Sequence, residues 1–114
     1  MYARSKAEAE TLAASRHPNT VIVRLSLVLG LPLLAGGNAF LPGLLRRLSA
    51  GEKTPFPVNE IRTPVDVVTV GAALLELAEA DYRGLLHLAG CTRLSRYEMA
   101  CRIAHHLGFS DTLI

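Results

Sequence analysis

The chain has 114 residues, of which 50% are hydrophobic and 19% are charged, against about 25% charged residues in typical soluble domains. A chain of this length is expected to form one domain with a core of its own. Its 12 basic and 10 acidic residues give a formal net charge of +2, whereas proteins that bind nucleic acids or anionic membranes carry clustered positive charge. We therefore expect neither nucleic acid nor a membrane as a partner.

Membrane spans, signal peptides, disulfides and metal sites are not predicted either. The longest apolar candidate, residues 21–35, is interrupted by charged and turn-forming residues before it reaches the roughly 18 residues of a span, and the N-terminus lacks the apolar stretch of a signal peptide. Cys91 and Cys101 match neither a zinc knuckle nor a secreted disulfide scaffold. His105 and His106 have no cysteine or carboxylate at metal-ligand spacing. We expect a cytoplasmic protein whose two cysteines are thiols.

The first 30 residues predict a helix followed by a strand. Residues 2–16 are rich in Ala, Glu and Arg and contain no helix breaker before Pro18, which favours a helix. Because its one large aliphatic residue is Leu12, this helix suits close packing against a sheet or a ligand. Residues 21–23 form a β-branched run that predicts a buried strand, and this strand leads into the segment 24–30.

Two helices are predicted in the middle of the chain, separated by extended pieces. The first is capped by Asn38 or begins near Pro42, and Gly51 ends it. Its large apolar side chains fall on one helical stripe: Phe40, Leu41, Leu44, Leu45 and Leu48. Prolines restrict residues 54–64 to short extended pieces. Residues 66–80 then form a helix that is apolar nearly all round, which predicts burial on several sides.

The C-terminal part predicts a second strand and a last helix. Residues 85–89 are strongly apolar and predict a buried strand, in which His87 is expected to be a core histidine. Ser95 and Glu98 have capping-box spacing. The helix that they open ends at Gly108 and is expected to direct four side chains inward: Ala100, Ile103, Ala104 and Leu107. Helices that alternate with such apolar strands predict an α/β fold whose sheet is covered on both faces.

Tyr2 and Lys6 lie four residues apart on the first predicted helix, so they project from the same face, one turn apart. An ammonium group near a phenol stabilises the phenolate, and a Tyr-x-x-x-Lys pair can therefore donate a proton to a carbonyl. The same spacing occurs by chance in many helices. Taken alone, the pair is weak evidence for catalysis, and a surface tyrosine beside a solvated lysine is the simpler interpretation.

Further motifs give this pair a context. The run Tyr-Ala-Arg-Ser-Lys-Ala-Glu-Ala-Glu at 2–10 precedes a strand that ends in Val-Arg-Leu-Ser-Leu-Val-Leu-Gly at 23–30. Four motifs follow in order: Gly-Asn-Ala-Phe at 37–40, Arg-Thr-Pro-Val at 62–65, Gly-Leu-Leu-His-Leu-Ala-Gly at 84–90 and Leu-Ser-Arg-Tyr-Glu at 94–98. Across essentially its whole length the chain resembles the second half of an extended short-chain dehydrogenase/reductase. Within that superfamily it is most similar to the dTDP-4-dehydrorhamnose reductase group.

The resemblance implies part of a Rossmann-like parallel sheet with a small C-terminal substrate-binding portion. It also implies reduction, by NADH or NADPH, of the 4-keto group of a nucleotide-activated deoxysugar. Tyr2 would donate the proton and Lys6 would hydrogen-bond the nicotinamide ribose, so both are candidate catalytic and cofactor-binding residues. Arg24, Leu25 and Ser26, at the carboxyl end of the first strand, would border the nicotinamide, since ligands of open α/β sheets bind at that end.

On the substrate side the resemblance implies two residues. Arg62 matches a position at which related enzymes place an arginine on the nucleotide diphosphate, a role suited to a forked, permanently charged group. Asn38 is the second candidate. Residues 1–30 would be the end of the NAD(P)-binding Rossmann domain. Residues 31–114 would form the substrate-binding portion, with returning Rossmann elements near 66–90.

The chain also departs from the family pattern. It contains no strand followed by the Gly-rich turn whose amides hold the cofactor pyrophosphate. The Ser or Thr that normally assists the tyrosine from upstream is absent, and Thr69 stands where many relatives have Asp. We therefore expect a carboxyl-terminal fragment of a reductase that binds NADP or NAD poorly by itself. Its strands and apolar helix would lack packing partners, which predicts exposed apolar surface and self-association.

Two other functions stay open. A chain without the Gly-rich turn could be a non-catalytic accessory or binding module of the same fold. An epimerase or dehydratase of the same superfamily would use the same tyrosine and lysine on another sugar nucleotide. Among the remaining charged residues, Glu8 and Glu10 are expected to be acids on the surface of the first helix, and Arg46 and Arg47 to lie on the solvated face of theirs.

Overall fold

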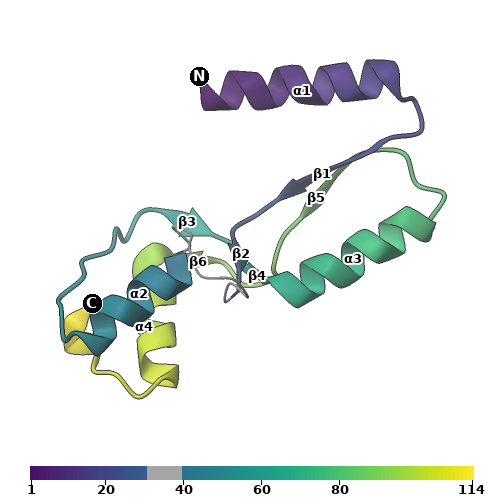
Figure 1. Ribbon diagram of the computed structural model, residues 1–114. Coiled ribbons are helices and arrows are strands. Elements are labelled where there is room, and N and C mark those ends of the chain that lie inside the picture. Colours follow the sequence, from purple (N-terminus) through teal and green to yellow (C-terminus); the bar gives the residue numbers. More distant parts are fainter. Residues whose placement is uncertain (31–39) are drawn as a thin grey trace. The chain divides into compact units, whose positions relative to one another are not determined.

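The computed structural model describes residues 1–30 and 40–114, so the predicted substrate residue Asn38 lies outside the described residues. The described elements follow one another along the chain (Figure 1): α1 (Tyr2–Arg16), β1 (Val21–Leu25), β2 (Val28–Leu29), α2 (Phe40–Ser49), β3 (Ile61–Arg62), β4 (Val65–Asp66), α3 (Val67–Glu79), β5 (Gly84–Leu88), β6 (Leu94–Ser95), α4 (Arg96–His106) and the 3-10 helix η1 (Asp111–Leu113). The predicted alternation of helices and strands is confirmed. The short strands β2, β4 and β6 were not predicted as strands.

The chain divides into two compact units, each built from two separate stretches of sequence. The first unit comprises residues 1–25 and 68–88, and the second comprises residues 26–67 and 89–114. The first therefore contains α1, β1, β5 and nearly all of α3. The second contains α2, α4, η1 and the four shorter strands.

A parallel strand pair forms the centre of the first unit. β1 and β5 pair over their whole lengths, from Val21 opposite Gly84 to Leu25 opposite Leu88. A parallel pair needs a long crossover connection. Here the chain returns through α3, and Gly84, in the left-handed backbone region with φ 104°, opens the second strand. This pairing brings the carboxyl ends of two apolar strands to one edge.

The best-packed core lies in the second unit, where α2 meets α4. Leu44 and Leu48 of α2 are each 2% exposed, and Ala100 and Ala104 of α4 are fully buried. Leucine side chains of one helix thus pack against alanines of the other. The predicted stripe on α2 is thereby confirmed, as are the exposed positions of Arg46 and Arg47. Leu107, in contrast, was predicted to point inward and is 44% exposed.

The predicted capping box opens α4. The Ser95 hydroxyl accepts a hydrogen bond from Glu98 N at 3.0 Å, and Ser95 N donates to the Glu98 carboxylate at 2.7 Å. The hydrogen bond from Ser95 N is the main cause that lowers the pKa of the Glu98 carboxyl. At the other end, Gly108 adopts φ 76°, the left-handed conformation that commonly ends helices.

We expect Ser95→Ala to lower the free energy of unfolding by about 1 kcal/mol, the usual cost of removing an N-cap side chain. Ser95 is suited to this test because it is 4% exposed and its hydroxyl serves the helix terminus. Urea unfolding followed by circular dichroism measures the change. Ser15→Ala is the matched control, since Ser15 lies on exposed α1 and its hydroxyl donates to Leu12 O. Equal effects of both substitutions would contradict the expectation.

Several segments that were predicted to be buried are exposed. Val68 and Leu75 of α3 are 76% and 70% exposed, so the expectation that this helix is buried on several sides is wrong for the described chain. The strands predicted as buried are half-buried or exposed along β1 and β5. His87 is exposed rather than a core histidine. These exposures match the expectation that apolar elements lack packing partners.

No helix within residues 1–30 and 40–114 is long and apolar enough to cross a bilayer. The same residues hold no cluster of histidine, cysteine or acidic side chains that could bind a metal ion. Cys91 and Cys101 are free thiols, as predicted.

Candidate functional site

The first turns of α1 hold Tyr2 and Lys6 on one face of the helix. The Tyr2 side chain is largely free, since the residue is 76% exposed. The Lys6 Nζ atom lies 5.5 Å from the centroid of the Tyr2 ring, within the range of a cation–π contact. The predicted pair therefore exists as a juxtaposition of an accessible phenol and an ammonium group.

Glu10 continues the same stripe and joins α1 to β1. Its carboxylate accepts a hydrogen bond from Arg24 Nε at 2.9 Å and one from Arg24 Nη2 at 2.6 Å. This is the forked geometry of a strong guanidinium–carboxylate pair. Glu10 was predicted only as an acid on the helix surface, and its pairing with a residue of the neighbouring strand was not predicted. Arg24, the predicted cofactor-bordering residue, is held by that pair.

The Glu10–Arg24 pair contributes to the stability of the folded state in a pH-dependent way. The hydrogen bond from Arg24 lowers the pKa of the Glu10 carboxyl, and the same contact raises the pKa of Arg24. A carboxyl whose pKa is lowered on folding stabilises the folded state above its unfolded pKa of about 4.3. We expect this contribution to disappear as the pH falls through the lowered folded value.

An NMR titration of the Glu10 carboxyl carbon tests the expected pH dependence. The midpoint should lie below the ordinary glutamate value of about 4.3. Arg24→Ala should return the Glu10 midpoint to the ordinary carboxyl range. A midpoint that Arg24→Ala leaves unchanged would show that the pair does not control this titration.

The two other residues predicted at the end of the first strand have different surroundings. Leu25 is the last residue of β1 and is 46% exposed. Ser26 belongs to the second unit, where its hydroxyl lies 2.9 Å from the Thr63 hydroxyl. Thr63 also accepts a hydrogen bond from Gly90 N through its carbonyl oxygen. Ser26 is therefore tied to the segment that carries the predicted substrate residue Arg62.

Arg62 shares a carboxylate with a second arginine. Its Nη2 atom and the Nη1 atom of Arg96 each lie 3.4 Å from Oε2 of Glu60. Both distances are at the long end of the hydrogen-bond range, and all three side chains are partly exposed. Two guanidinium groups thus converge on one oxygen position.

Arg96 also covers a pair of aromatic rings. Its guanidinium carbon lies 5.4 Å from the Phe40 ring centroid and 5.9 Å from that of Phe56. The two rings meet edge to face, with centroids 5.5 Å apart. Around them is a recess of about 160 Å³ that is rich in basic side chains; its lining comprises Phe40, Gly43, Leu44, Arg46, Arg47, Thr54, Phe56 and Arg96.

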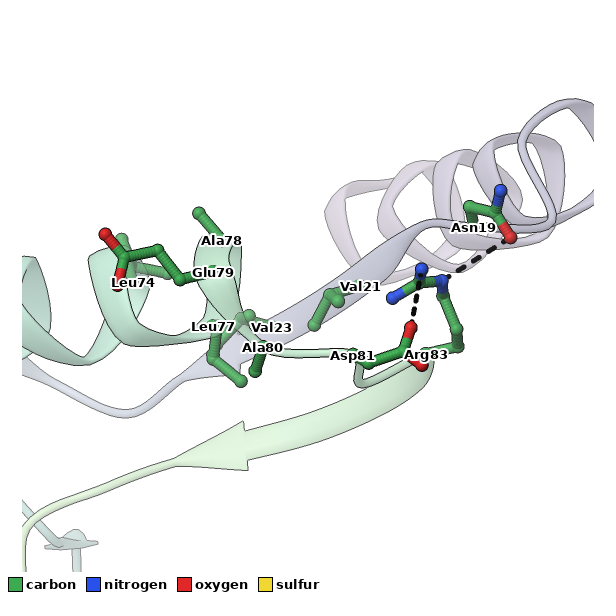
Figure 2. A pocket seen from close by; sticks show the side chains of 10 residues that line it. All are labelled: Asn19, Val21, Val23, Leu74, Leu77, Ala78, Glu79, Ala80, Asp81 and Arg83. Carbon is green, nitrogen blue, oxygen red and sulfur yellow. Dashed lines mark hydrogen bonds and ion pairs between the residues drawn. The ribbon is translucent and has the colours of Figure 1, made fainter.

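A larger recess, of about 590 Å³, lies in the first unit between β1 and the C-terminal end of α3 (Figure 2). Val21 and Val23 contribute apolar surface from the strand. Arg83, paired with Asp81 at 2.9 Å, forms a polar rim with Asn19. Of the described residues that were predicted to bind cofactor or substrate, none lines this recess. We regard it as part of the exposed apolar surface rather than as the candidate site.

The predicted site residues are distributed over both units. Tyr2, Lys6, Arg24 and Leu25 lie in the first, and Ser26 and Arg62 lie in the second. Sequence reasoning missed two further groups. The position of Glu10, four residues after Lys6, could have placed it on the same helix face as Tyr2 and Lys6. The contacts of Arg96 with Glu60 and the aromatic rings had no signal in the local sequence.

Comparison with known proteins gives a family match over residues 1–114, to the model described as the RmlD substrate binding domain. A dTDP-4-dehydrorhamnose reductase of Sinorhizobium fredii is 31% identical over 97 residues, which cover 79% of this chain and 31% of the relative. A probable low-salt glycan biosynthesis reductase of Haloferax volcanii is 29% identical over 117 residues, covering 99% of this chain and 38% of that protein. The chain thus spans about a third of the length of these curated relatives.

Solved structures share the fold. The dTDP-4-dehydrorhamnose reductase of Bacillus anthracis, solved in complex with NADP, gives a TM-score of 0.86 at 23% identity and covers 96% of this chain and 37% of its own. A UDP-N-acetylglucosamine 4-epimerase of Methanobrevibacter ruminantium gives 0.81 at 24% identity, over 97% of this chain and 38% of its own. At these identities the likeness concerns the fold, and it confirms the predicted α/β class.

Proposed function

The chain belongs to the RmlD substrate binding domain family, and we propose that it is the part of an NAD(P)H-dependent sugar-nucleotide reductase that carries the catalytic Tyr2–Lys6 pair and part of the substrate site. The sequence-based prediction of the family is thereby confirmed. The observation that carries the proposed activity is the accessible Tyr2 phenol with the Lys6 ammonium 5.5 Å from its ring centroid. Two curated relatives named as reductases support it.

In this proposal Tyr2 is the proton donor. Its phenol donates to the 4-keto oxygen of the sugar as the carbonyl carbon is reduced to an alcohol. Lys6, on the next helical turn, favours the phenolate that remains, because an ammonium group stabilises a nearby negative charge. A reduced nicotinamide supplies the hydride when it is bound. The chain's own contribution is to place one acid and one cation at the reacting carbonyl.

The described residues fit the nicotinamide end of such a cofactor. An exposed hydroxyl–ammonium pair offers hydrogen-bond donors for a ribose, and Arg24, Leu25 and Ser26 follow at the end of a parallel strand. The Bacillus relative was solved with NADP and a further fold relative, WbmG of Bordetella bronchiseptica, with NAD, so both dinucleotides stay candidates. Because the sequence has no Gly-rich turn, we expect the 114-residue chain to bind either dinucleotide weakly.

For the substrate, we propose a nucleotide diphosphate contact at Arg62 and Arg96. Their guanidinium groups already converge on the Glu60 carboxylate at 3.4 Å. A diphosphate carries more charge than a single carboxylate and accepts forked hydrogen bonds from arginine, so it could replace Glu60. The neighbouring Phe40 and Phe56 rings offer an apolar edge beside these cations. Asn38 stays a proposed substrate residue.

The two units are assigned different ligands in this proposal. We propose that the first unit is the end of a NAD(P)-binding Rossmann domain, with α3 and β5 as its returning elements, and that the second is the substrate-binding portion. Exposed apolar side chains on α3 such as Val68 and Leu75 would promote self-association of the isolated chain. A reducing cytoplasm would keep Cys91 and Cys101 as thiols.

The test uses a whole reductase that carries these residues, supplied with a nucleotide-linked 4-keto-6-deoxysugar. Loss of NADPH absorbance together with formation of the 4-hydroxy product is the expected result, and NADH in place of NADPH measures the cofactor preference. Interconversion of sugar epimers without net NADPH consumption would indicate an epimerase instead. Binding of the nucleotide sugar without any turnover would favour the accessory module.

A further inference from the structure

Helix α1 has little apolar packing to fix its orientation. None of its 15 residues is buried, and its one large aliphatic side chain, Leu12, is 53% exposed. Arg4 pairs with Glu8 within the helix itself. The Glu10–Arg24 ion pair leaves the helix and reaches β1. Among the described residues, no second ion pair joins α1 to β1 or β5. A helix held in this way is expected to turn about its axis unless that pair restrains it.

The pair holds the stripe on which the proposed proton donor stands. Tyr2, Lys6 and Glu10 are spaced by four residues, so each lies about 40° around the helix from the next. Fixing Glu10 toward β1 therefore fixes the direction in which Lys6 and Tyr2 project. A rotation of α1 about its own axis would carry all three side chains away together.

The pair also sets how far Tyr2 reaches along the strand. α1 runs back along β1 in the opposite direction within the first unit (Figure 1). Glu10 meets Arg24, the residue before the last of β1. At about 1.5 Å per helical residue, Tyr2 lies roughly 12 Å beyond Glu10 along the helix axis. The strand has one residue left after Arg24, or about 3.3 Å. Tyr2 therefore projects beyond the carboxyl end of β1, where ligands of open α/β sheets bind.

The surroundings of the pair favour its formation. Glu10 is the more shielded partner, with 25% of its side chain exposed against 48% for Arg24. His87, on β5, is directly opposite Arg24 in the strand register. Its charge, when it is protonated, acts on Glu10 in the same direction as Arg24 does. An arginine and a histidine from two strands thus lie on the side of the carboxylate from the helix.

We propose that Glu10, through its two hydrogen bonds to Arg24, is a positioning residue that sets the rotation of α1 and so directs Tyr2 and Lys6 past the carboxyl end of β1. Glu10 does not touch the reacting groups. It acts through the helix, and its role in catalysis rests on the proposed reductase function. Its role in orienting α1 does not.

The orientation is tested on the 114-residue chain with pairs of nitroxide labels. One label is placed at Asp81→Cys and the other at Ala3→Cys or Ser5→Cys, in a background with both native cysteines changed to serine. Ala3 lies seven residues from Glu10 and hence within about 20° of it around the helix, whereas Ser5 lies about 140° away. Two narrow and different distance distributions are expected for the parent chain.

Glu10→Ala should broaden both distributions and bring their means together, because the helix is then free to turn. Glu8→Ala is the matched control, since it removes the Arg4 pair from the same helix and should leave both distributions narrow. The charge-swapped double variant Glu10→Arg with Arg24→Glu should restore two separate, narrow distributions. Distributions that Glu10→Ala leaves narrow and separate would overturn the proposal.

Turnover gives the second readout, in the whole reductase. Glu10→Ala should lower kcat by about tenfold to a hundredfold, the range expected when a reacting group is misplaced by about 1 Å, with KM for the nucleotide sugar within about twofold. Glu8→Ala should match the parent. An unchanged kcat in an active enzyme would overturn the proposal. An inactive parent with shifted label distances would instead refute the reductase function and leave the orienting role standing.

Discussion

Replacing Tyr2 with phenylalanine is expected to lower kcat for keto reduction by about 10³-fold, while the affinity for NADPH changes by less than about twofold. A positioned general acid typically contributes a factor of about 10² to 10⁴, and the substitution removes the hydroxyl alone. The ring, and with it the cation–π contact to Lys6 at 5.5 Å, is retained. Stopped-flow measurement of NADPH oxidation in the whole reductase, with a separate fluorescence titration of NADPH, separates chemistry from binding.

Tyr82→Phe is the matched control for this prediction. Tyr82 is also a partly exposed tyrosine of the first unit, 39% exposed, and its hydroxyl donates to Leu85 O at 3.1 Å. Losing that hydrogen bond should affect stability slightly and turnover hardly at all. Parent-like turnover in the Tyr2→Phe enzyme would show that another group donates the proton. Loss of NADPH binding together with turnover would assign Tyr2 to cofactor binding instead.

The elements of the fold were predictable from sequence because their signals are local. The alanine-rich run ending before Pro18 gives α1, and the Ser95–Glu98 spacing gives the start of α4 to the residue. The two-residue strands were not predictable, since β2, β4 and β6 each depend on a partner far along the chain. A pair of residues carries too little periodicity to be recognised without that partner.

Burial was harder to predict than secondary structure. Apolar composition alone predicts a buried α3 and a core His87, because both predictions assume that every apolar element packs against another element. The family resemblance changed that expectation, since it placed these elements against parts of a larger fold. The exposures of Val68 and Leu75 agree with the second expectation.

For the candidate site, the sequence supplied single residues but not their partners. The contact between Tyr2 and Lys6 was predictable because the two residues lie one turn apart on the same helix. Glu10 and Arg24 are 14 residues apart on different elements, and the spacing of Glu10 from Lys6 indicates its face of the helix but not its partner. The shared Glu60 carboxylate likewise links Arg62 to Arg96 across 34 positions of sequence, and no motif connects the two arginines.

Gly90 is the position in the second unit at which we expect a single methyl group to be most harmful. A Cβ atom there would meet the carbonyl oxygen of Pro64, with Pro64 C and Thr63 O also close. These are backbone atoms, so they cannot move aside as the end of a flexible side chain would. Gly90 N also donates to Thr63 O at 3.1 Å. An alanine would therefore have to displace the strap at residues 63–64 or break that hydrogen bond.

We expect Gly90→Ala to lower the free energy of unfolding by about 2 to 3 kcal/mol, the upper range for overpacking a well-fitted site. Gly43→Ala is the matched control, because Gly43 lies in α2 with open space where its Cβ would be. That substitution should stabilise the chain by up to about 1 kcal/mol, as alanine is the better helix former. Urea unfolding followed by circular dichroism compares the two. A Gly90→Ala chain within about 0.5 kcal/mol of the parent would contradict the close approach.

The same substitution should reach the candidate site. Thr63 follows Arg62 directly, and its hydroxyl lies 2.9 Å from that of Ser26. Displacing the strap therefore moves a proposed cofactor residue and a proposed diphosphate residue at once. In the whole reductase we expect Gly90→Ala to raise KM for the nucleotide sugar at temperatures where the enzyme is still folded. Thr63→Val, which removes the Ser26 contact without adding bulk at Gly90, separates the loss of that hydrogen bond from displacement of the strap. If only Gly90→Ala raises KM, the absence of a side chain at Gly90 is what keeps Arg62 in position.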